Sequence, residues 1–380
     1  GYYFSLYCSC IFHRSIFFVV VGEIQGTSGL LRLNTPLLTI AGSAIGLLMG
    51  LAFYFDWLYL LSIPIILAVC YTAIYHIELL FQSIVFFAPL SINIEEYTDQ
   101  FGLFVPSEPL LFGLMLLFAF YQLKSKLIDP QFFRHPLVLI LVGYLAWLII
   151  CSITSTHPVV SFKSVLSRLW FIVPVLFFGT VLLYKEKSIS RFFWLLSIGT
   201  VLVILFTLLN HASYGFGEKE SHWVMSPFYK DHTIYGAAVA LVVPFPVMLF
   251  LMKKQSPLLS FILGLLFLII MLGLYFSYTR AAWLSVFGAI IVLALVIFKV
   301  RFNVVFALGL IALITLVWKR DDIQMELARN KTEHTTEAFD ERLQSAANVT
   351  TDASNLERIN RWSCALEMFK ERPIFGFGPG

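Results

Sequence analysis

Charged residues are scarce in this sequence. Only 13% of its 380 residues are Asp, Glu, Lys or Arg, whereas roughly 25% is usual in soluble domains. Hydrophobic residues make up 59% of the chain and include 38 Phe, which is more apolar surface than a soluble fold of this size can bury. The composition therefore excludes a soluble enzyme, a disordered chain and a nucleic-acid-binding domain.

Paired cysteines are also lacking. The five Cys residues include no Cys-x-x-Cys pair, which argues against a zinc site or a disulfide framework. Residues 1–21 carry no recognisable charged region or cleavage site of a signal peptide. We interpret this stretch, which His13 and Arg14 interrupt, as a partial first span.

Long apolar runs take the place of charge. A membrane-spanning helix needs about 20 predominantly apolar residues, and eleven runs lie near 37–54, 57–75, 77–92, 106–122, 137–152, 165–184, 192–210, 233–252, 257–277, 281–298 and 302–318. The predicted fold class is all-α. Residues 1–318 are expected to form a polytopic transmembrane helical bundle of about 11–12 spans, and residues 319–380 one large loop containing amphipathic helices.

Basic residues are divided unevenly between the loops on the two sides of these spans. One set of alternating loops holds Arg32, Lys124, Lys126, Arg134, Lys185, Lys187, Arg191, Lys253, Lys254, Lys299 and Arg301. The other set, before residue 319, holds only Lys163, Arg168, Lys219, Lys230 and Arg280. Because basic loops stay in the cytoplasm, the second set and residues 319–380 are predicted to face outward, which in a bacterium is the periplasm.

The outer loops hold most of the polar chemistry. Residues 152–164 are rich in Ser and Thr, and residues 211–232 contain His211, His222 and His232. Ionisable residues are nearly absent from the middle of the spans, and no internal repeat is visible. Transporters place polar groups at mid-membrane on broken helices, so the sequence disfavours a transporter.

Residues 319–380 are predicted to contain an amphipathic helix followed by a turn. Ser354 and Glu357 fit a capping box, and an apolar face at helical spacing ends before Pro373 and consists of Leu356, Ile359, Trp362, Leu366 and Phe369. This face either packs on neighbouring helices or lies on the membrane surface over a lipid-binding cavity. The Gly/Pro run 373–380 is predicted to be a tight turn that brings its backbone close to another element.

Two arginines lie at the outer edge of the predicted spans. Arg280 lies between two spans with almost no loop, and Arg168 lies about one turn inside a span. An arginine in hydrocarbon costs roughly 2.5–3.5 kcal/mol on insertion scales and is usually paired or faces a cavity. The alternative is that the side chain snorkels to lipid head groups. Since a guanidinium binds phosphate in a bidentate manner, both are candidate phosphate ligands.

Three segments, taken in order, resemble the O-antigen ligase and polymerase family. Their sequences are DHTIYG at 231–236, SYTRAAWL at 277–284, and ERINRW through ERPIFGFGPG at 357–380. The first is similar to a loop-to-span junction of that family and the second to its Ser-x-Ser-Arg-like turn before a late span. The third resembles the Arg…Trp helix and the Phe-Gly-x-Gly turn of its large periplasmic loop.

The resemblance implies a bacterial inner-membrane glycosyltransferase that needs no metal and no other cofactor. It would take a glycan from undecaprenyl pyrophosphate on the periplasmic side. A ligase attaches the glycan to lipid A–core, and we expect this activity first; a polymerase attaches it to another repeat unit and is the alternative. The implied partners are the lipid-linked glycan, the acceptor and membrane lipids, with no nucleic acid. A lipid-linked oligosaccharide flippase is the alternative from another class, and a non-enzymatic scaffold explains the outer loops poorly.

The resemblance also implies the site residues. Arg280 and Arg168 match the two membrane-edge arginines that hold the pyrophosphate, and Arg358 and Arg361 are further expected substrate-binding residues. The family's catalytic His follows the Phe-Gly-x-Gly turn. We therefore expect that His, and further spans, beyond Gly380.

One histidine within the sequence is a weak candidate for the catalytic base. His232 lies beside Asp231, whose carboxylate could fix the tautomer of the imidazole. The favoured interpretation of Asp231 is instead that it caps the helix that begins after it.

The uneven distribution of basic residues generates a topology prediction. Single cysteines at Lys124, Lys187 and Lys253 should react only with reagents that reach the cytoplasm, and cysteines at Glu220 and Asp340 only with reagents applied from outside. Cytoplasmic labelling of positions 220 and 340 would contradict the predicted orientation.

Overall fold

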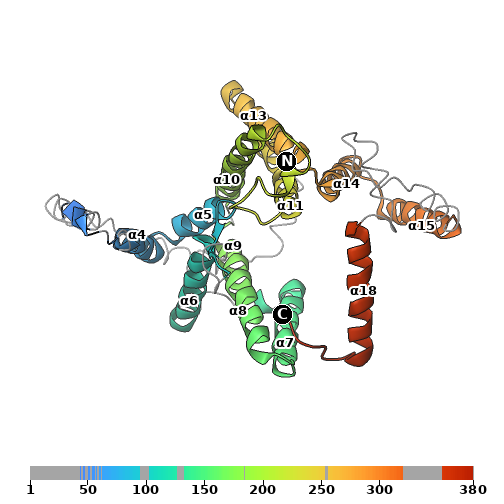
Figure 1. The fold of residues 1–380 in the computed structure, drawn as a ribbon, viewed down its shortest axis with the longest axis horizontal. Helices are drawn as coiled ribbons and strands as arrows, with labels where there is room; N and C mark the ends of the chain where they lie inside the picture. The colour runs from blue at the N-terminus through green and yellow to red at the C-terminus, as the bar shows by residue number, and fades with distance from the viewer. Residues whose placement is uncertain are drawn as a thin grey trace.

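A computed structural model describes residues 62–94, 102–125, 132–183, 185–252, 256–319 and 353–379, with scattered residues between 43 and 60. The described part is almost entirely helical (Figure 1). Six apolar stretches are long enough to cross a bilayer: α7 (Pro136–Ile153), Pro158–Leu182, α10 (Glu186–Ser213), His232–Met252, α13 (Pro257–Tyr275) and α14 (Arg280–Ile297). The predicted all-α polytopic membrane fold is confirmed.

Four other predicted spans are helical but are not among these six stretches. They are α4 (Ser62–Tyr75), α5 (Ile77–Phe87), α6 (Ser107–Ser125), whose apolar part is Ser107–Leu123, and α15 (Phe302–Trp318). The run predicted at 77–92 ends early because Pro89 follows α5 and cannot continue a helix. The run at 37–54 and residues 1–21 lie wholly or mostly outside the described residues.

The span predicted at 165–184 begins earlier than expected. Helix α8 (Pro158–Val173) starts with Pro158 in its first turn, where the missing N–H costs nothing. It continues through a π-helical turn, η4 (Pro174–Phe178), into α9 (Gly179–Leu182). Pro174 lacks the N–H that a regular α-helix needs there, which explains the wider turn. Part of the predicted Ser/Thr-rich loop is therefore helix.

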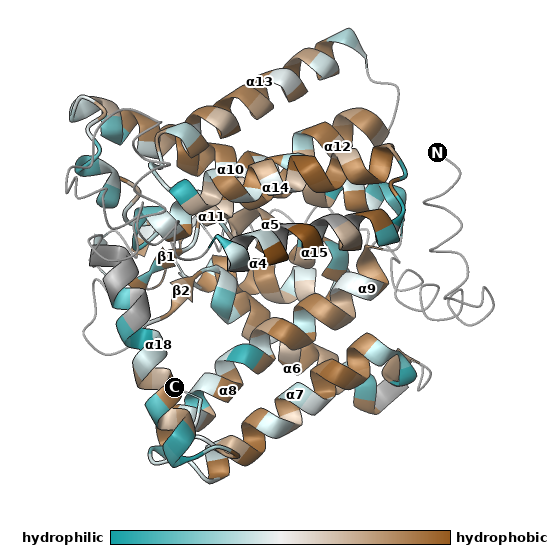
Figure 2. Cartoon of the chain, turned by 90° about the vertical axis from the view of Figure 1, so that its right-hand side faces the viewer, coloured by the Kyte–Doolittle hydropathy of each residue, from teal (hydrophilic) through white to brown (hydrophobic). Residues whose placement is uncertain are grey.

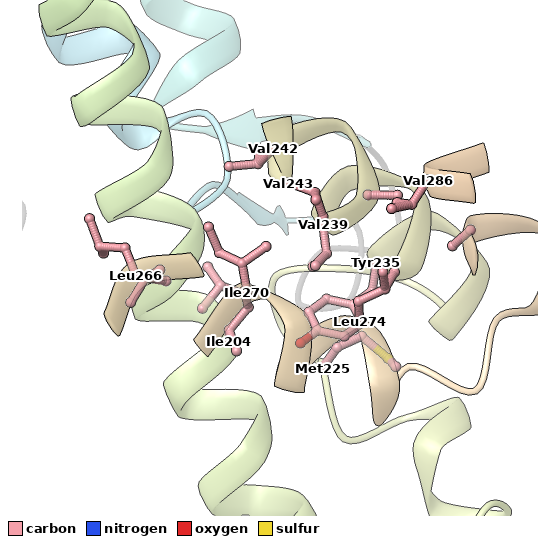
Figure 3. Packing of buried hydrophobic residues seen from close by; sticks show 14 of the residues in the cluster. Ile204, Met225, Tyr235, Val239, Val242, Val243, Leu266, Ile270, Leu274 and Val286 are labelled. Carbon is pink, nitrogen blue, oxygen red and sulfur yellow. The ribbon is translucent and has the colours of Figure 1, made fainter. Parts of the chain in front are cut away.

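Two hydrophobic cores hold the bundle together. The larger joins α10, α13 and α14 to α11 (His232–Val242) and α12 (Pro244–Met252), with Ile204, Val239 and Ile270 completely buried (Figure 3). The smaller core joins α5 and α6 to η4, with Leu114 at its centre. Helix α10 lies between the two cores and contributes partly buried side chains to both.

Close approach at glycines tightens this packing. A Cβ at Gly199 of α10 would collide with the backbone carbonyl oxygen of Phe86 and lie 2.9 Å from Pro89 Cγ. A Cβ at Gly273 of α13 would lie 2.7 Å from Cγ2 of Ile204. Small residues at helix contacts are typical of membrane bundles, where lipid competes equally well for apolar surface.

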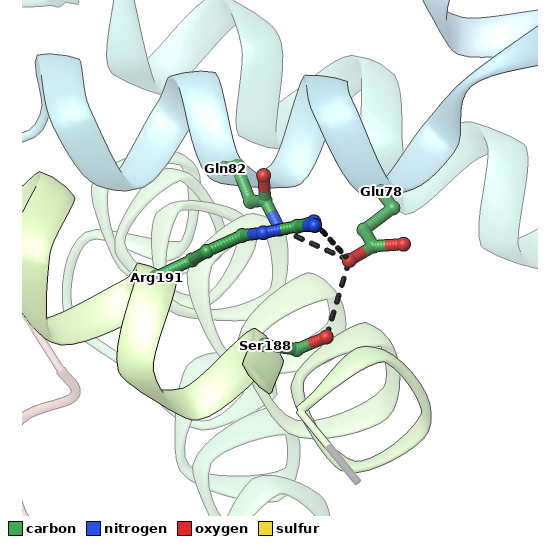
Figure 4. A network of polar contacts seen from close by, with 4 residues as sticks. All are labelled: Glu78, Gln82, Ser188 and Arg191. Carbon is green, nitrogen blue, oxygen red and sulfur yellow. Dashed lines mark hydrogen bonds and ion pairs between the residues drawn. The ribbon is translucent and has the colours of Figure 1, made fainter. Parts of the chain in front are cut away.

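A polar network joins α5 to α10 at one end of the bundle (Figure 4). Glu78 Oε1 accepts hydrogen bonds from Gln82 Nε2 at 3.1 Å, Ser188 Oγ at 3.1 Å and Arg191 Nη1 at 3.2 Å. The Glu78–Arg191 pair is partly exposed and contributes about 0.2–1 kcal/mol. The contact agrees with the predicted alternation of the spans, which places the start of α5 and the start of α10 on the same side.

The opposite end carries the β-hairpin and the last described helix (Figure 2). Strands β1 (Ile92–Asn93) and β2 (Phe104–Val105) pair antiparallel, with Ile92 opposite Val105. Helix α18 (Ala353–Glu371) confirms the predicted amphipathic helix, although Ser354 falls inside it rather than before it. Its described apolar side chains, including Trp362 and Phe369, are exposed. Of the two predicted placements of this face, packing on neighbouring helices is therefore not seen among the described residues.

The glycine contacts predict opposite effects for two matched substitutions. Gly199→Ala should destabilise the protein by about 1–3 kcal/mol, because the new methyl group meets backbone that cannot move away. Gly264→Ala, on α13 with nothing within 4 Å of the new Cβ, should be neutral or stabilise by up to about 1 kcal/mol. Thermal unfolding in detergent measures both, and equal melting temperatures would contradict the packing.

Candidate functional site at the ends of the spans

Arg280 is the first residue of α14 and follows a tight turn. Helix α13 ends at Tyr275, and the four residues Phe276–Thr279 reverse the chain. Tyr278 adopts a positive φ of 52°, which is uncommon for a residue with a side chain. Arg280 itself is half-buried. The prediction that Arg280 lies between two spans with almost no loop is confirmed.

The turn before Arg280 packs on the first turn of α11. Thr279 Oγ1 donates a hydrogen bond of 2.8 Å to the carbonyl oxygen of His232. A Cβ at Gly236 would lie 2.7 Å from Cβ of Thr279 and 3.0 Å from Oγ of Ser277. Only a glycine permits this approach without a shift, so two of the three sequence motifs, at 231–236 and 277–284, form one contact.

Asp231 caps α11, as the favoured interpretation predicted. Its Oδ1 accepts hydrogen bonds from the backbone N–H of Thr233 at 2.7 Å and of Ile234 at 2.9 Å, and from the Thr233 hydroxyl. Partial burial acts to raise the pKa of Asp231, but these hydrogen bonds and the nearby His232 hold it below its ordinary value. The stabilisation of α11 by the ionised Asp231 carboxylate is thus fully present above pH ~4, and it is lost as the pH falls through the lowered pKa of Asp231.

The ring of His232 lies against His222 and not against the carboxylate that a catalytic Asp–His pair needs. Its ring lies edge-on to that of His222, with 4.0 Å between ring centroids. Its buried Nδ1 has no hydrogen-bond partner among the residues that the structure describes, and the described hydrogen bonds of Asp231 go to residues 233 and 234. The structure thus gives no support to Asp231 as the residue that fixes the tautomer of His232.

Sequence reasoning missed the buried role of His211. Its Nε2 lies 2.8 Å from the carbonyl oxygen of Gly217, and its ring packs against Phe216 and Tyr278. Tyr278 in turn donates a 2.8 Å hydrogen bond from its hydroxyl to the carbonyl oxygen of Phe216. The loop after α10 is therefore fastened to the Arg280 turn. The closely spaced Gly215 and Gly217 were the available signal of a tight loop here.

A tyrosine pair lies beneath this edge. Tyr229 and Tyr235 have ring centroids 5.8 Å apart, and Tyr235 is almost completely buried. Burial raises the pKa of Tyr229 to about 12. The Tyr229 hydroxyl therefore stays protonated at neutral pH. It can donate a hydrogen bond, but it does not form the phenolate that would act as a base.

Arg168 lies in a second polar cluster, on α8. Its Nη1 donates hydrogen bonds to Ser164 Oγ at 2.6 Å and to the Ser164 carbonyl oxygen at 3.3 Å. Ser161, Ser164 and Arg168 share one face of the helix by their spacing. The half-buried guanidinium thus has part of its donor set engaged within α8.

The C-terminal Gly/Pro turn docks beside this cluster. Ser155 Oγ donates a 2.9 Å hydrogen bond to the carbonyl oxygen of Phe377, and the Thr156 N–H donates to the same oxygen at 3.3 Å. Because the single hydroxyl proton of Ser155 is used there, Ser161 donates across the 2.8 Å contact between the two hydroxyls. The predicted tight turn that approaches another element is confirmed, and that element is the junction of α7 and α8.

Gly378 makes the docking possible. Its φ of +108° is unfavourable for residues with a Cβ. A Cβ at this position would also lie 2.6 Å from Cβ of Ser155 and from Oγ of Ser161. Aromatic contacts add to the interface, since Phe375 stacks on Trp147 of α7 with 5.9 Å between centroids, and the Arg372 guanidinium lies 4.7 Å from the Phe377 ring centroid.

The structure does not bring the predicted arginines into one cluster. Helix α8 packs on α6 and α7, helix α14 packs on α11, and the two lie apart in Figure 1. Arg361 forms an exposed ion pair with Glu357 on α18. The side chain of Arg358 lies outside the described part of the structure.

Comparison with known proteins bears on the second half of the chain. The family model described as O-antigen ligase matches residues 265–380. The resemblance to the O-antigen ligase family is confirmed. No curated protein and no solved structure matches the chain.

The O-antigen ligase match covers the residues around Arg280 and the docked turn. It begins within α13 and includes α14, α15, α18 and the Phe377–Gly378 contact with Ser155. The junction at 231–236 lies before the match, yet it is in direct contact with the matched turn through Thr279 and Gly236. The matched residues therefore contact α11 at one place and the α7–α8 junction at another.

The contact of Thr279 with α11 predicts how the Arg280 turn responds to substitution. Thr279→Val removes the hydroxyl and with it the hydrogen bond to the His232 carbonyl oxygen, which should cost about 0.5–1.5 kcal/mol. Thr279→Ser keeps the hydroxyl and should lose less than half as much. Thermal unfolding of the purified variants compares them. Equal losses would show that the hydrogen bond does not hold the turn.

Proposed function

We propose that this chain is a membrane glycosyltransferase of the O-antigen ligase type. It would move a glycan from undecaprenyl pyrophosphate to lipid A–core or a related acceptor on the periplasmic face of a bacterial inner membrane. The observation that carries the proposal is the O-antigen ligase match over residues 265–380, which contains the Arg280 turn. The family implies a lipid-linked glycan substrate.

Arg280 has the properties of a ligand for the donor pyrophosphate. It is half-buried at the end of a spanning stretch and stands at the N-terminus of α14, where the helix dipole also favours negative charge. When the bond between sugar and phosphate breaks, negative charge develops on the leaving pyrophosphate. A fixed guanidinium at the poorly hydrated membrane edge would stabilise that charge more than water does. No metal ion is required for this step.

Arg168 is proposed as the second arginine of the site. It lies on α8, the helix whose Ser161 contacts Ser155 beside the docked Phe377–Gly378 turn. For both arginines to bind one pyrophosphate group, α8 and α14 would have to come closer together than they lie in Figure 1. We therefore propose Arg280 as the principal donor ligand.

The Arg280 turn yields the functional prediction. In the full-length protein, Arg280→Ala should lower glycan transfer at least about 100-fold, as loss of a charge-stabilising donor does in other enzymes. Arg280→Lys should restore little, because lysine lacks the bidentate geometry. Arg301→Ala, an exposed arginine on the predicted inner side, is the matched control and should retain activity.

The assay is transfer of lipid-linked glycan to lipid A–core in membranes, with and without EDTA. If the glycan grows longer on the lipid carrier and none appears on lipid A–core, the protein is the polymerase. If the lipid-linked glycan crosses the membrane without any bond cleavage, the protein is a flippase. Near-normal transfer by Arg280→Ala would refute the role of Arg280. Complete loss with EDTA would refute metal-independent transfer.

A further inference from the structure

Helix α18 carries an apolar stripe that the described residues leave uncovered. Trp362, Leu366 and Phe369 are 76%, 59% and 62% exposed, and their spacing places them on one face. Charged pairs, Arg361 with Glu357 and Lys370 with Glu367, occupy other positions of the same helix. Three large exposed side chains in a row are a costly surface in water and indicate a missing apolar partner.

The direction of α18 differs from that of the spans. In Figure 2 it runs crosswise to α7 and α8, at the end of the bundle that also carries the β1–β2 hairpin and the end of the chain. A helix that runs across the ends of spanning helices lies along the membrane surface. This is the geometry of an amphipathic helix that rests in the head-group region.

The chain that follows α18 is fixed at the depth of that region. Phe375 stacks on Trp147, which is itself 46% exposed on the flank of α7. Trp147 lies six residues before Ile153, the end of α7, which is about 9 Å along the helix axis. Tryptophan is enriched at this level of a bilayer. The turn therefore reaches into the edge of the membrane and holds the C-terminal end of α18 beside it.

We infer that α18 lies in the outer leaflet boundary, with Trp362, Leu366 and Phe369 inserted among lipid acyl chains and head groups. Its partner is the lipid bilayer surface of its own membrane. The crosswise direction and the anchored turn favour lipid over a second copy of the chain or another protein segment. The inference depends on the membrane fold and not on the proposed transfer reaction. Its consequence is that the extramembrane segment is held where a lipid-linked substrate would arrive.

Spin labels on the two faces of α18 test this placement. In full-length protein with its native cysteines replaced, Leu366→Cys and Trp362→Cys carry the label on the stripe, and Glu367→Cys carries it on the charged face as the matched control. The protein is reconstituted into phosphatidylethanolamine–phosphatidylglycerol vesicles. Collisions of the label with oxygen, which concentrates in lipid, are compared with collisions with a water-soluble nickel chelate.

The expected result is a severalfold higher ratio of oxygen to nickel collisions at 366 and 362 than at 367. Equal, high nickel accessibility at all three positions would overturn the inference, because the helix would then be surrounded by water. Exclusion of both reagents at 366 and 362 would also overturn it, because protein would then cover the stripe. Either outcome leaves the effect of Arg280→Ala on transfer unchanged, so the two proposals fail separately.

Discussion

The contact between the Ser277–Thr279 turn and Gly236 holds the start of α14 against α11. Within a bilayer, lipid covers apolar surface as well as a neighbouring helix does, so close approach and a few hydrogen bonds must hold the spans in place. Here a missing side chain at Gly236 admits Thr279, whose hydroxyl then reaches the His232 carbonyl oxygen. Arg280, the first residue of α14, directly follows this turn.

A second contact holds the turn that follows α18. The carbonyl oxygen of Phe377 is bound by Ser155, and the positive φ of Gly378 lets the two backbones meet. Both contacts use a glycine and a small hydroxyl residue. The first directly precedes Arg280, and the second involves Ser161 of α8, the helix that carries Arg168. The matched segment is thus held by two docked turns on different helices, and α18 connects to the second of them.

The sequence was sufficient for the helices, the capping role of Asp231 and the tight turn at 373–380, because these depend on apolar runs and on neighbouring residues. It could not show which segments meet. Ser155 and Phe377 are 222 residues apart in the chain, and nothing in either local sequence specifies the other. The burial of His211 also depends on Phe216, Phe276 and Tyr278 around it. The start of α8 was misplaced because its serines look like loop residues until Pro158 is recognised as a helix start.

Binding of the lipid pyrophosphate, measured apart from any transfer, tests the central claim most directly. The full-length protein in lipid nanodiscs is titrated with undecaprenyl pyrophosphate, and the affinity of wild type is compared with those of Arg280→Gln and Arg301→Gln. A charge-assisted contact of about 1.5–3 kcal/mol predicts a Kd at least tenfold weaker for Arg280→Gln and unchanged for Arg301→Gln. Equal affinity of Arg280→Gln and wild type would contradict the assignment of Arg280 to the donor phosphate.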